Sequence, residues 1–378
     1  MTVAGQACFD GPATIDCDFE CRSMRVEGKG FGPAGDVTIN GNLAVDEGAD
    51  LDAAVRVAGS VRAGTLDVAG HLRSGQLSTR RLRVGGHLEV RGELAAEEVD
   101  VGGHMTAHGE VKINNLRVGG HTKIGGGSIS GDIRVRGHFS TTEKLAFGRL
   151  QTFGNTVLPA GSSGERLSAL GRVEFGGDAS CREFDVIGSA KLRGALSTEN
   201  VNVKGSLDAS GDFRVSKRFQ VWGSADISGA LVCDALDIGG KLVAGRATVT
   251  NITTIAGEVR TNLGLKSTSV VVGKGSKVTG PIYAESVEVG SEADLGSIWG
   301  LPWWRGTLGR PTIVGDVHGD EVTVRAHSRA EHIFGRLVEL EEGAMAEEIV
   351  YTGEVKLPQK YFLTKPPKRV GSLPESPF

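Results

Sequence analysis

The sequence has few aromatic residues, few prolines and no long apolar run. Phe, Trp and Tyr make up 5% of the 378 residues, and the chain has 11 prolines and 5 cysteines. No stretch approaches the roughly 20 apolar residues of a membrane span, and the N-terminus has neither the charged nor the apolar part of a signal peptide. The formal net charge of −4 excludes a strongly basic surface, so nucleic acid is not an expected partner. We therefore expect a cytoplasmic protein.

The sequence also lacks the short motifs that mark common enzyme sites. It contains no Walker loop, no GxSxG elbow, no HExxH pair and no pair of CxxC motifs. Cys8, Cys17 and Cys21 are close enough in the sequence to hold a metal. Because they lack CxxC spacing and a nearby histidine, we expect buried thiols rather than a zinc site. We expect no catalytic residue, no cofactor and no enzymatic activity.

What the sequence has in abundance is glycine, at 57 residues, and a repeat of about 17 residues. Most copies have an apolar residue, usually a second one two positions on, and a glycine two positions after that, as in Leu82-Arg-Val84-Gly-Gly86. Fourteen copies keep this register, and they begin at Leu66, Leu82, Val99, Leu116, Ile133, Leu150, Leu167, Phe184, Val201, Phe219, Leu236, Thr253, Val270 and Val287. A repeat of this regularity indicates a fold built from stacked identical units.

Each copy reads as three short strands joined by bends, because apolar residues alternate with others and glycines follow. In the copy LRVGGHLEVRGELAAEE, Leu82 and Val84 should point inward, Gly86 should bend the chain, and Leu88 and Leu94 should begin the second and third sides. Such short strands bury little alone, so equivalent strands of successive copies must pair and align their inward residues into columns. We predict an all-β, single-stranded, three-sided β-solenoid with about 17 residues per coil.

We divide the chain by how well it keeps this register. The divisions are 1–65 for N-terminal coils with a less regular register, 66–290 for the regular body, 291–355 for C-terminal coils with a Trp-rich segment, and 356–378 for a Lys- and Pro-containing, largely disordered tail. The distance from Val287 to Val322 equals two coils. The tail is expected to stay outside the ladder because proline has no N–H to donate.

Two groups of aromatic residues are candidate interaction residues. Trp299, Trp303 and Trp304 either fill a locally wider core or form an exposed patch for a partner. Tyr361 and Phe362 follow the last motif, and we expect them to fold back over the last coil.

Five of the nine histidines follow the corner glycine in successive copies. They are His71, His87, His104, His121 and His138. At about 4.8 Å between coils, their imidazoles would stack, share a metal ion or repel one another when protonated. The column continues with other polar residues, so we favour a structural corner and keep the histidines as weak metal candidates.

The glycine-cornered, valine-rich repeat, with segments such as LRVGGHLEVRGEL and VNVKGSLDASGDF and a proline-containing tail, resembles the bactofilins, the polymer-forming cytoskeletal proteins. The resemblance covers roughly residues 1–350. It implies a right-handed triangular β-helix that assembles end to end into nucleotide-independent filaments and scaffolds cell-envelope proteins at the membrane. The chain departs from the family in its length, and the family's short N-terminal membrane-targeting segment is not visible.

The physics of a repeat points to the same expectation. The backbone groups of a terminal coil lack partners on one side and can pair with another copy, and the motif that begins at Met1 leaves little room for a cap. We expect a non-catalytic filament protein whose main partner is itself, with the membrane surface or cell-envelope proteins as further partners. The alternatives are an acyltransferase-like β-helix enzyme and a passive binding or adhesin-like rod.

Overall fold

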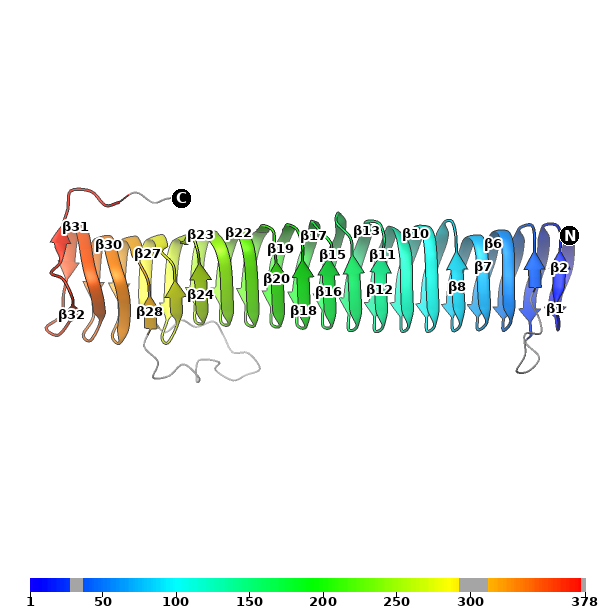
Figure 1. Ribbon diagram of the computed structural model, residues 1–378, viewed down its shortest axis with the longest axis horizontal. Coiled ribbons are helices and arrows are strands. Elements are labelled where there is room, and N and C mark those ends of the chain that lie inside the picture. Colours follow the sequence, from blue (N-terminus) through cyan, green and yellow to red (C-terminus); the bar gives the residue numbers. More distant parts are fainter. Residues whose placement is uncertain (28–36, 292–311, 375–378) are drawn as a thin grey trace. The chain divides into compact units, whose positions relative to one another are not determined.

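The computed structural model describes residues 1–27, 37–291 and 312–374, and its regular elements in these ranges are all strands (Figure 1). The described part of the chain holds no apolar helix of membrane-spanning length. The chain divides into two compact units, residues 1–181 and 182–378. Each unit is a stack of coils.

The strands of the first unit are β1 (Thr2–Phe9), β2 (Ala13–Ile15), β3 (Phe19–Val26), β4 (Val37–Ile39), β5 (Leu43–Leu51), β6 (Ala54–Val68), β7 (His71–Val84), β8 (His87–Val90), β9 (Leu94–Val101), β10 (His104–Val118), β11 (His121–Val135), β12 (His138–Thr141), β13 (Leu145–Thr152), β14 (Asn155–Leu158), β15 (Ser162–Ala169) and β16 (Arg172–Phe175). β17 (Ala179–Val186) has residues of both units.

The strands of the second unit are β18 (Ser189–Leu192), β19 (Leu196–Val203), β20 (Ser206–Ala209), β21 (Phe213–Val221), β22 (Ser224–Ile238), β23 (Lys241–Ile255), β24 (Glu258–Thr261), β25 (Leu265–Gly273), β26 (Lys277–Thr279), β27 (Ile282–Ser291), β28 (Thr312–Val314), β29 (Val317–Val324), β30 (Ser328–Leu340), β31 (Met345–Lys356), β32 (Phe362–Leu363) and β33 (Lys368–Arg369).

Parallel pairing between successive coils confirms the predicted solenoid. β10 pairs with β11 so that each residue faces the one about 17 positions later in the chain. Two register shifts divide this pairing into three segments, 104–107, 110–113 and 116–118. Three paired segments for each coil are the three sides of the solenoid, because a bend between sides interrupts the ladder.

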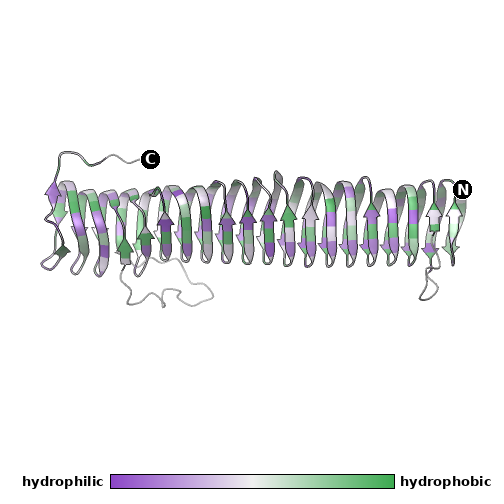
Figure 2. Cartoon of the chain, viewed as in Figure 1, coloured by the Kyte–Doolittle hydropathy of each residue, from purple (hydrophilic) through white to green (hydrophobic). Residues whose placement is uncertain are grey.

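The core of each coil is made by alternate residues of the strands. Val84, Val101, Val118 and Val135 occupy one inward column of the first unit, and none is more than 2% exposed. In each strand, the residues directly before and after the inward valine face solvent. Polar and apolar residues therefore alternate along the strands (Figure 2). β-branched residues suit such a column because they pack well on a pleated surface.

The corner glycines are required by the close approach of neighbouring coils. A Cβ added to Gly103 would overlap the carbonyl oxygens of Gly85 and Gly86 in the preceding coil. A Cβ added to Gly102, one position earlier, would lie 3.8 Å from the nearest atom, the carbonyl oxygen of Val84. The repeated glycine therefore marks the corner at which the backbones of successive coils lie too close together for a side chain.

The ladder shows how the irregular ends of the repeat are built. Val37 pairs with Val55 and Val55 with Leu72, which places all three at the start of the second side. Val287 pairs directly with Val322. The expected two coils between these residues are therefore wrong: one coil step separates them, and residues 292–311 are inserted between β27 and β28.

The segment that follows β31 is more ordered than the sequence predicts. We expected residues 356–378 to be a largely disordered tail, but the structure describes this segment as far as residue 374. Phe362 of β32 pairs with Met345, and Lys368 of β33 pairs with Val350. The prolines do not prevent this because none of them lies within β32 or β33. The donors are other residues, such as Val370, whose N–H donates to the carbonyl oxygen of Tyr351 at 2.8 Å.

Candidate functional site

The five predicted histidines form one stacked column on the first unit. The ring centroids of His71 and His87 are 5.0 Å apart, those of His87 and His104 4.6 Å, and those of His104 and His121 5.2 Å. His138 continues the column at 5.5 Å with a tilt of 35°. In-register pairing of β7, β8, β10, β11 and β12 sets these distances, because each histidine begins its strand.

The stacked geometry does not favour metal binding. The planes of His87 and His104 differ by 2°, so the nitrogen lone pairs, which lie in the ring planes, run parallel and do not converge on a common point. Within the described ranges, no group of three or more His, Cys, Asp or Glu side chains is placed to hold a metal ion. Asn155 extends the column, with its Nδ2 3.2 Å from Nδ1 of His138.

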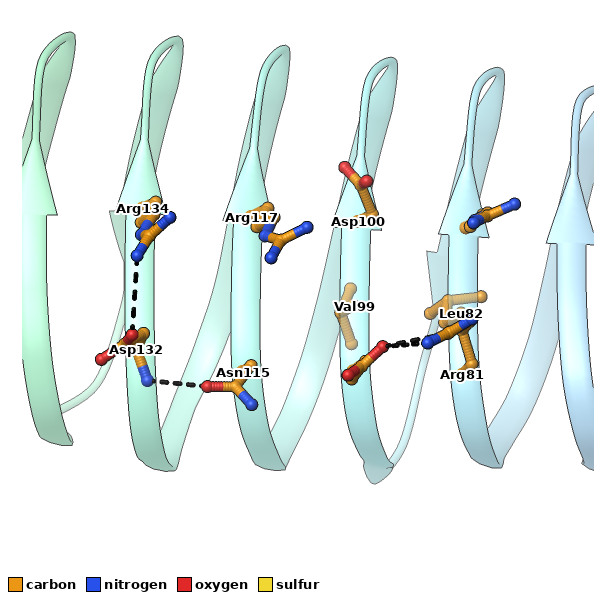
Figure 3. A pocket seen from close by; sticks show the side chains of 10 residues that line it. Arg81, Leu82, Val99, Asp100, Asn115, Arg117, Asp132 and Arg134 are labelled. Atoms are coloured by element: carbon orange, nitrogen blue, oxygen red, sulfur yellow. Dashed lines mark hydrogen bonds and ion pairs between the residues drawn. The ribbon is translucent and has the colours of Figure 1, made fainter.

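A shallow charged pocket of about 280 Å³ lies on another side of the first unit (Figure 3). Its outward column runs Arg83, Asp100, Arg117 and Arg134 through β7, β9, β10 and β11. Arg117 and Arg134 are neighbours in this column and would attract a small anion. Asp100, in the same column, opposes such binding by its negative charge.

Ion pairs between coils occupy the rest of this pocket. Nη2 of Arg81 lies 2.7 Å from Oε2 of Glu98. Asp132 lies 2.9 Å from Nε of Arg149, and its backbone N–H donates to Oδ1 of Asn115 at 2.9 Å. These side chains are between about a third and two thirds exposed, and such pairs contribute about 0–1 kcal/mol each. We therefore interpret this pocket as a charged surface that is exposed to solvent.

The second unit carries a groove whose centre is a column of aromatic rings. We call this the aromatic groove; its volume is about 480 Å³. Tyr283 of β27, His318 of β29 and Phe334 of β30 pair in register, with ring centroids 4.6 Å and 4.4 Å apart. Leu373 and Pro374, from the segment after β33, also line the groove.

Polar residues surround these rings. Thr248 and Lys266 continue the ring column on β23 and β25, and Thr250, Thr268, Glu285 and Asp320 also line the groove. An apolar strip with a few polar groups beside it is typical of ligand and peptide sites.

Burial changes the titration of two groups in the aromatic groove. Burial raises the pKa of the Tyr283 hydroxyl, and the negative charge of Asp316 raises it further. Burial lowers the pKa of His318, while Asp316 opposes this effect. Nδ1 of His332 lies 2.7 Å from Oδ1 of Asp316, and this hydrogen bond raises the pKa of His332.

The other predicted interaction residues do not form a site with one another. Trp299, Trp303 and Trp304 lie outside the described residues. Tyr361 is 43% and Phe362 60% exposed. Backbone pairing of Phe362 with Met345 brings this part of the chain back onto the last coil, although the ring faces solvent.

The ring column of the aromatic groove was not predicted from the sequence. Tyr283 and His318 are 35 positions apart, a distance that we counted as two coils, whereas β27 and β29 pair directly. His318 and Phe334 are separated by a step of 16. Only a count that leaves out the inserted residues 292–311 would have aligned the three rings.

The structure predicts which cysteines react in the folded protein. Cys8 and Cys17 are exposed, whereas Cys21, Cys181 and Cys233 are buried. The expectation of buried thiols is therefore wrong for Cys8 and Cys17, which lie on the first coil with one side uncovered. Burial raises the pKa of Cys233 to about 12, with help from Asp234 and Asp237, so this thiol forms almost no thiolate at neutral pH.

We expect a disulfide reagent such as Ellman's reagent to modify two thiols per native chain and all five after unfolding. Mass spectrometry of the labelled chain would identify them. Rapid modification of Cys21 or Cys233 in the native protein would contradict the coil packing.

Comparison with known proteins gives no relative: no family model, curated protein or solved structure matches the chain.

Proposed function

We propose that this chain is a non-catalytic structural protein that assembles with copies of itself, end coil to end coil, into filaments that need no nucleotide. The observation that carries the proposal is the half-exposed apolar face of the first coil. Strand edges without a partner promote strand addition from another molecule.

The first coil has inward side chains that the next coil would normally bury. Val3 and Ile15 are half-buried, whereas the residues that they pair with, Cys21 and Ile39, are 1% and 0% exposed. Among the described residues, β1 pairs with β3 on one edge. The other edge therefore has backbone groups and apolar side chains that a second copy can cover.

The last coil of the second unit is partly covered. β31 pairs with β30 along most of its length, and with β32 and β33 over four residues. Val355, near the end of β31, is half-buried, whereas its partner Val338 is 1% exposed. Part of this edge is thus available to the first coil of another copy.

The energetics of such a contact are favourable. Each new backbone hydrogen bond contributes about 0.5–1.5 kcal/mol, and full burial of one exposed aliphatic side chain contributes about 1.5–3 kcal/mol. Parallel pairing at the joint would continue the ladder that the coils already use.

Membership of the bactofilin family, to which the repeat is similar, is part of this proposal. It would place the filaments in the cytoplasm, where they would scaffold cell-envelope proteins or contact the membrane surface. The regular outward columns, such as the stacked histidines, would then repeat along the filament as binding positions for partners.

The test is assembly of the purified chain without nucleotide. We expect filaments in negative-stain electron microscopy and a sedimenting fraction that is unchanged by added ATP or GTP. Ile15→Asp places a charge on the apolar face of the first coil and should raise the critical concentration at least about tenfold.

Val232→Asp is the matched control because Val232 is 43% exposed on an outward position of β22. This variant should assemble like the original chain, and circular dichroism should show that both variants are folded. Single chains alone, over a wide range of salt and protein concentration, would refute the proposed assembly.

A further inference from the structure

The segment after β33 runs back along the coils of the second unit (Figure 1), and Leu373 and Pro374 reach the aromatic groove. We propose that the aromatic groove is a docking site for a proline-containing peptide and that its occupant is the chain's own segment 373–378, LPESPF. This inference concerns a side of the solenoid and does not depend on end-to-end assembly.

The burial of the ring column supports a covering segment. His87 and His104 in the first unit stack in the same way as Tyr283 and His318, and all four occupy outward positions. The two histidines of the first unit are exposed, whereas Tyr283 and His318 are half-buried. The neighbouring rings of Tyr283 and Phe334 cover part of His318, and Leu373 and Pro374, which line the same groove, add cover from outside the coil.

The chemistry of the segment fits the groove. Pro374 and Pro377 form a P-x-x-P spacing, which favours the extended polyproline II conformation. Segments of this kind dock onto grooves lined by aromatic rings, and their low conformational entropy reduces the cost of binding. In the described structure, Pro374 already contributes to the groove that contains the rings of Tyr283 and Phe334.

The length of the segment also matches that of the groove. The groove is lined by residues of β23, β25, β27, β29 and β30, and five strands at about 4.8 Å spacing extend over about 19 Å. Six residues in the polyproline II conformation, at about 3.1 Å each, extend over a similar distance. Among the described residues, the groove is lined by one cation, Lys266, and two carboxylates, Glu285 and Asp320. The contacts of the prolines and not the charge of Glu375 should therefore supply the affinity.

The test uses two forms of the chain and a fluorescein-labelled peptide of residues 371–378, GSLPESPF. The attached segment has an effective concentration in the millimolar range, so in the full chain it should exclude the free peptide. A chain that ends at Gly371 should bind the peptide at least about tenfold more tightly than the full chain, measured by fluorescence polarisation.

Variants distinguish groove binding from non-specific binding. In the shortened chain, Tyr283→Ala and His318→Ala should each weaken peptide binding at least about fivefold, whereas His104→Ala in the first unit should not change it. A full chain with Pro374→Ala and Pro377→Ala should gain binding of the free peptide. This variant keeps the segment, so it tests docking even if shortening the chain affects folding.

Equal binding by the full and shortened chains would overturn the proposal. So would equal binding of a control peptide in which both prolines are alanine.

Discussion

Gly103→Ala should lower the free energy of unfolding of the first unit by about 2–4 kcal/mol. The added Cβ would overlap the carbonyl oxygens of Gly85 and Gly86, which are backbone atoms and cannot rotate away. The coils would have to separate at this corner, which would weaken the hydrogen bond from the N–H of His104 to the carbonyl oxygen of Gly86, now 2.9 Å long. Urea unfolding followed by circular dichroism measures this loss.

Gly102→Ala is the matched control because it adds the same methyl group one residue earlier. Its Cβ would lie 3.8 Å from the carbonyl oxygen of Val84, an ordinary contact. The variant should change stability by less than about 1 kcal/mol, and the smaller freedom of the unfolded chain favours a slight gain. If the two alanine variants unfold at the same urea concentration, close approach of the coils is not the reason for the glycine column.

Phe213→Ala should have the largest effect in the second unit, a loss of about 3–5 kcal/mol in the free energy of unfolding. Phe213 of β21 is 0% exposed, and its ring lies 5.9 Å from that of Phe219, which is also fully buried. The inward columns of adjacent coils hold their spacing through backbone hydrogen bonds, so they cannot collapse into the cavity. Circular dichroism should show a lower midpoint temperature in thermal unfolding and a lower midpoint urea concentration in urea unfolding.

Two comparisons test the cause of that loss. Phe213→Leu leaves a smaller cavity and should cost less than half as much as Phe213→Ala. Ile252→Ala removes methyl groups from an outward position that is 40% exposed and should cost less than about 1 kcal/mol. A Phe213→Ala variant as stable as Ile252→Ala would show that this column is not a close-packed core.

The repeat was sufficient to predict the coils because the alternation along each strand and the pairing between coils select the same inward residues. Alternation made Leu82 and Val84 inward residues, and the ladder pairs them with Val99 and Val101 of the next coil. The fixed stride also predicted the histidine column, since in-register pairing carries any residue at a constant step onto the same face. Both predictions needed only the period of the chain and the geometry of a parallel ladder.

Where the spacing of the repeat changes, the sequence did not predict which strands pair. The inserted residues 292–311 concealed the direct pairing of Tyr283 with His318, and the stacked rings were therefore missed. The segment after β31 was expected to be disordered because it contains prolines, but its other residues pair with β31. Neither error changes which residues of the regular coils point inward, because the regular spacing alone fixes this.

The sequence by itself determined the solenoid, its inward columns, its glycine corners and the alignment of the histidines in one column, because each follows from a constant period. Only the tertiary structure decided which outward column is covered. Leu373 and Pro374 lie about 90 residues from Tyr283 in the chain, yet they line the same groove. Such a contact depends on the path of a segment outside the repeat, and no local pattern encodes that path.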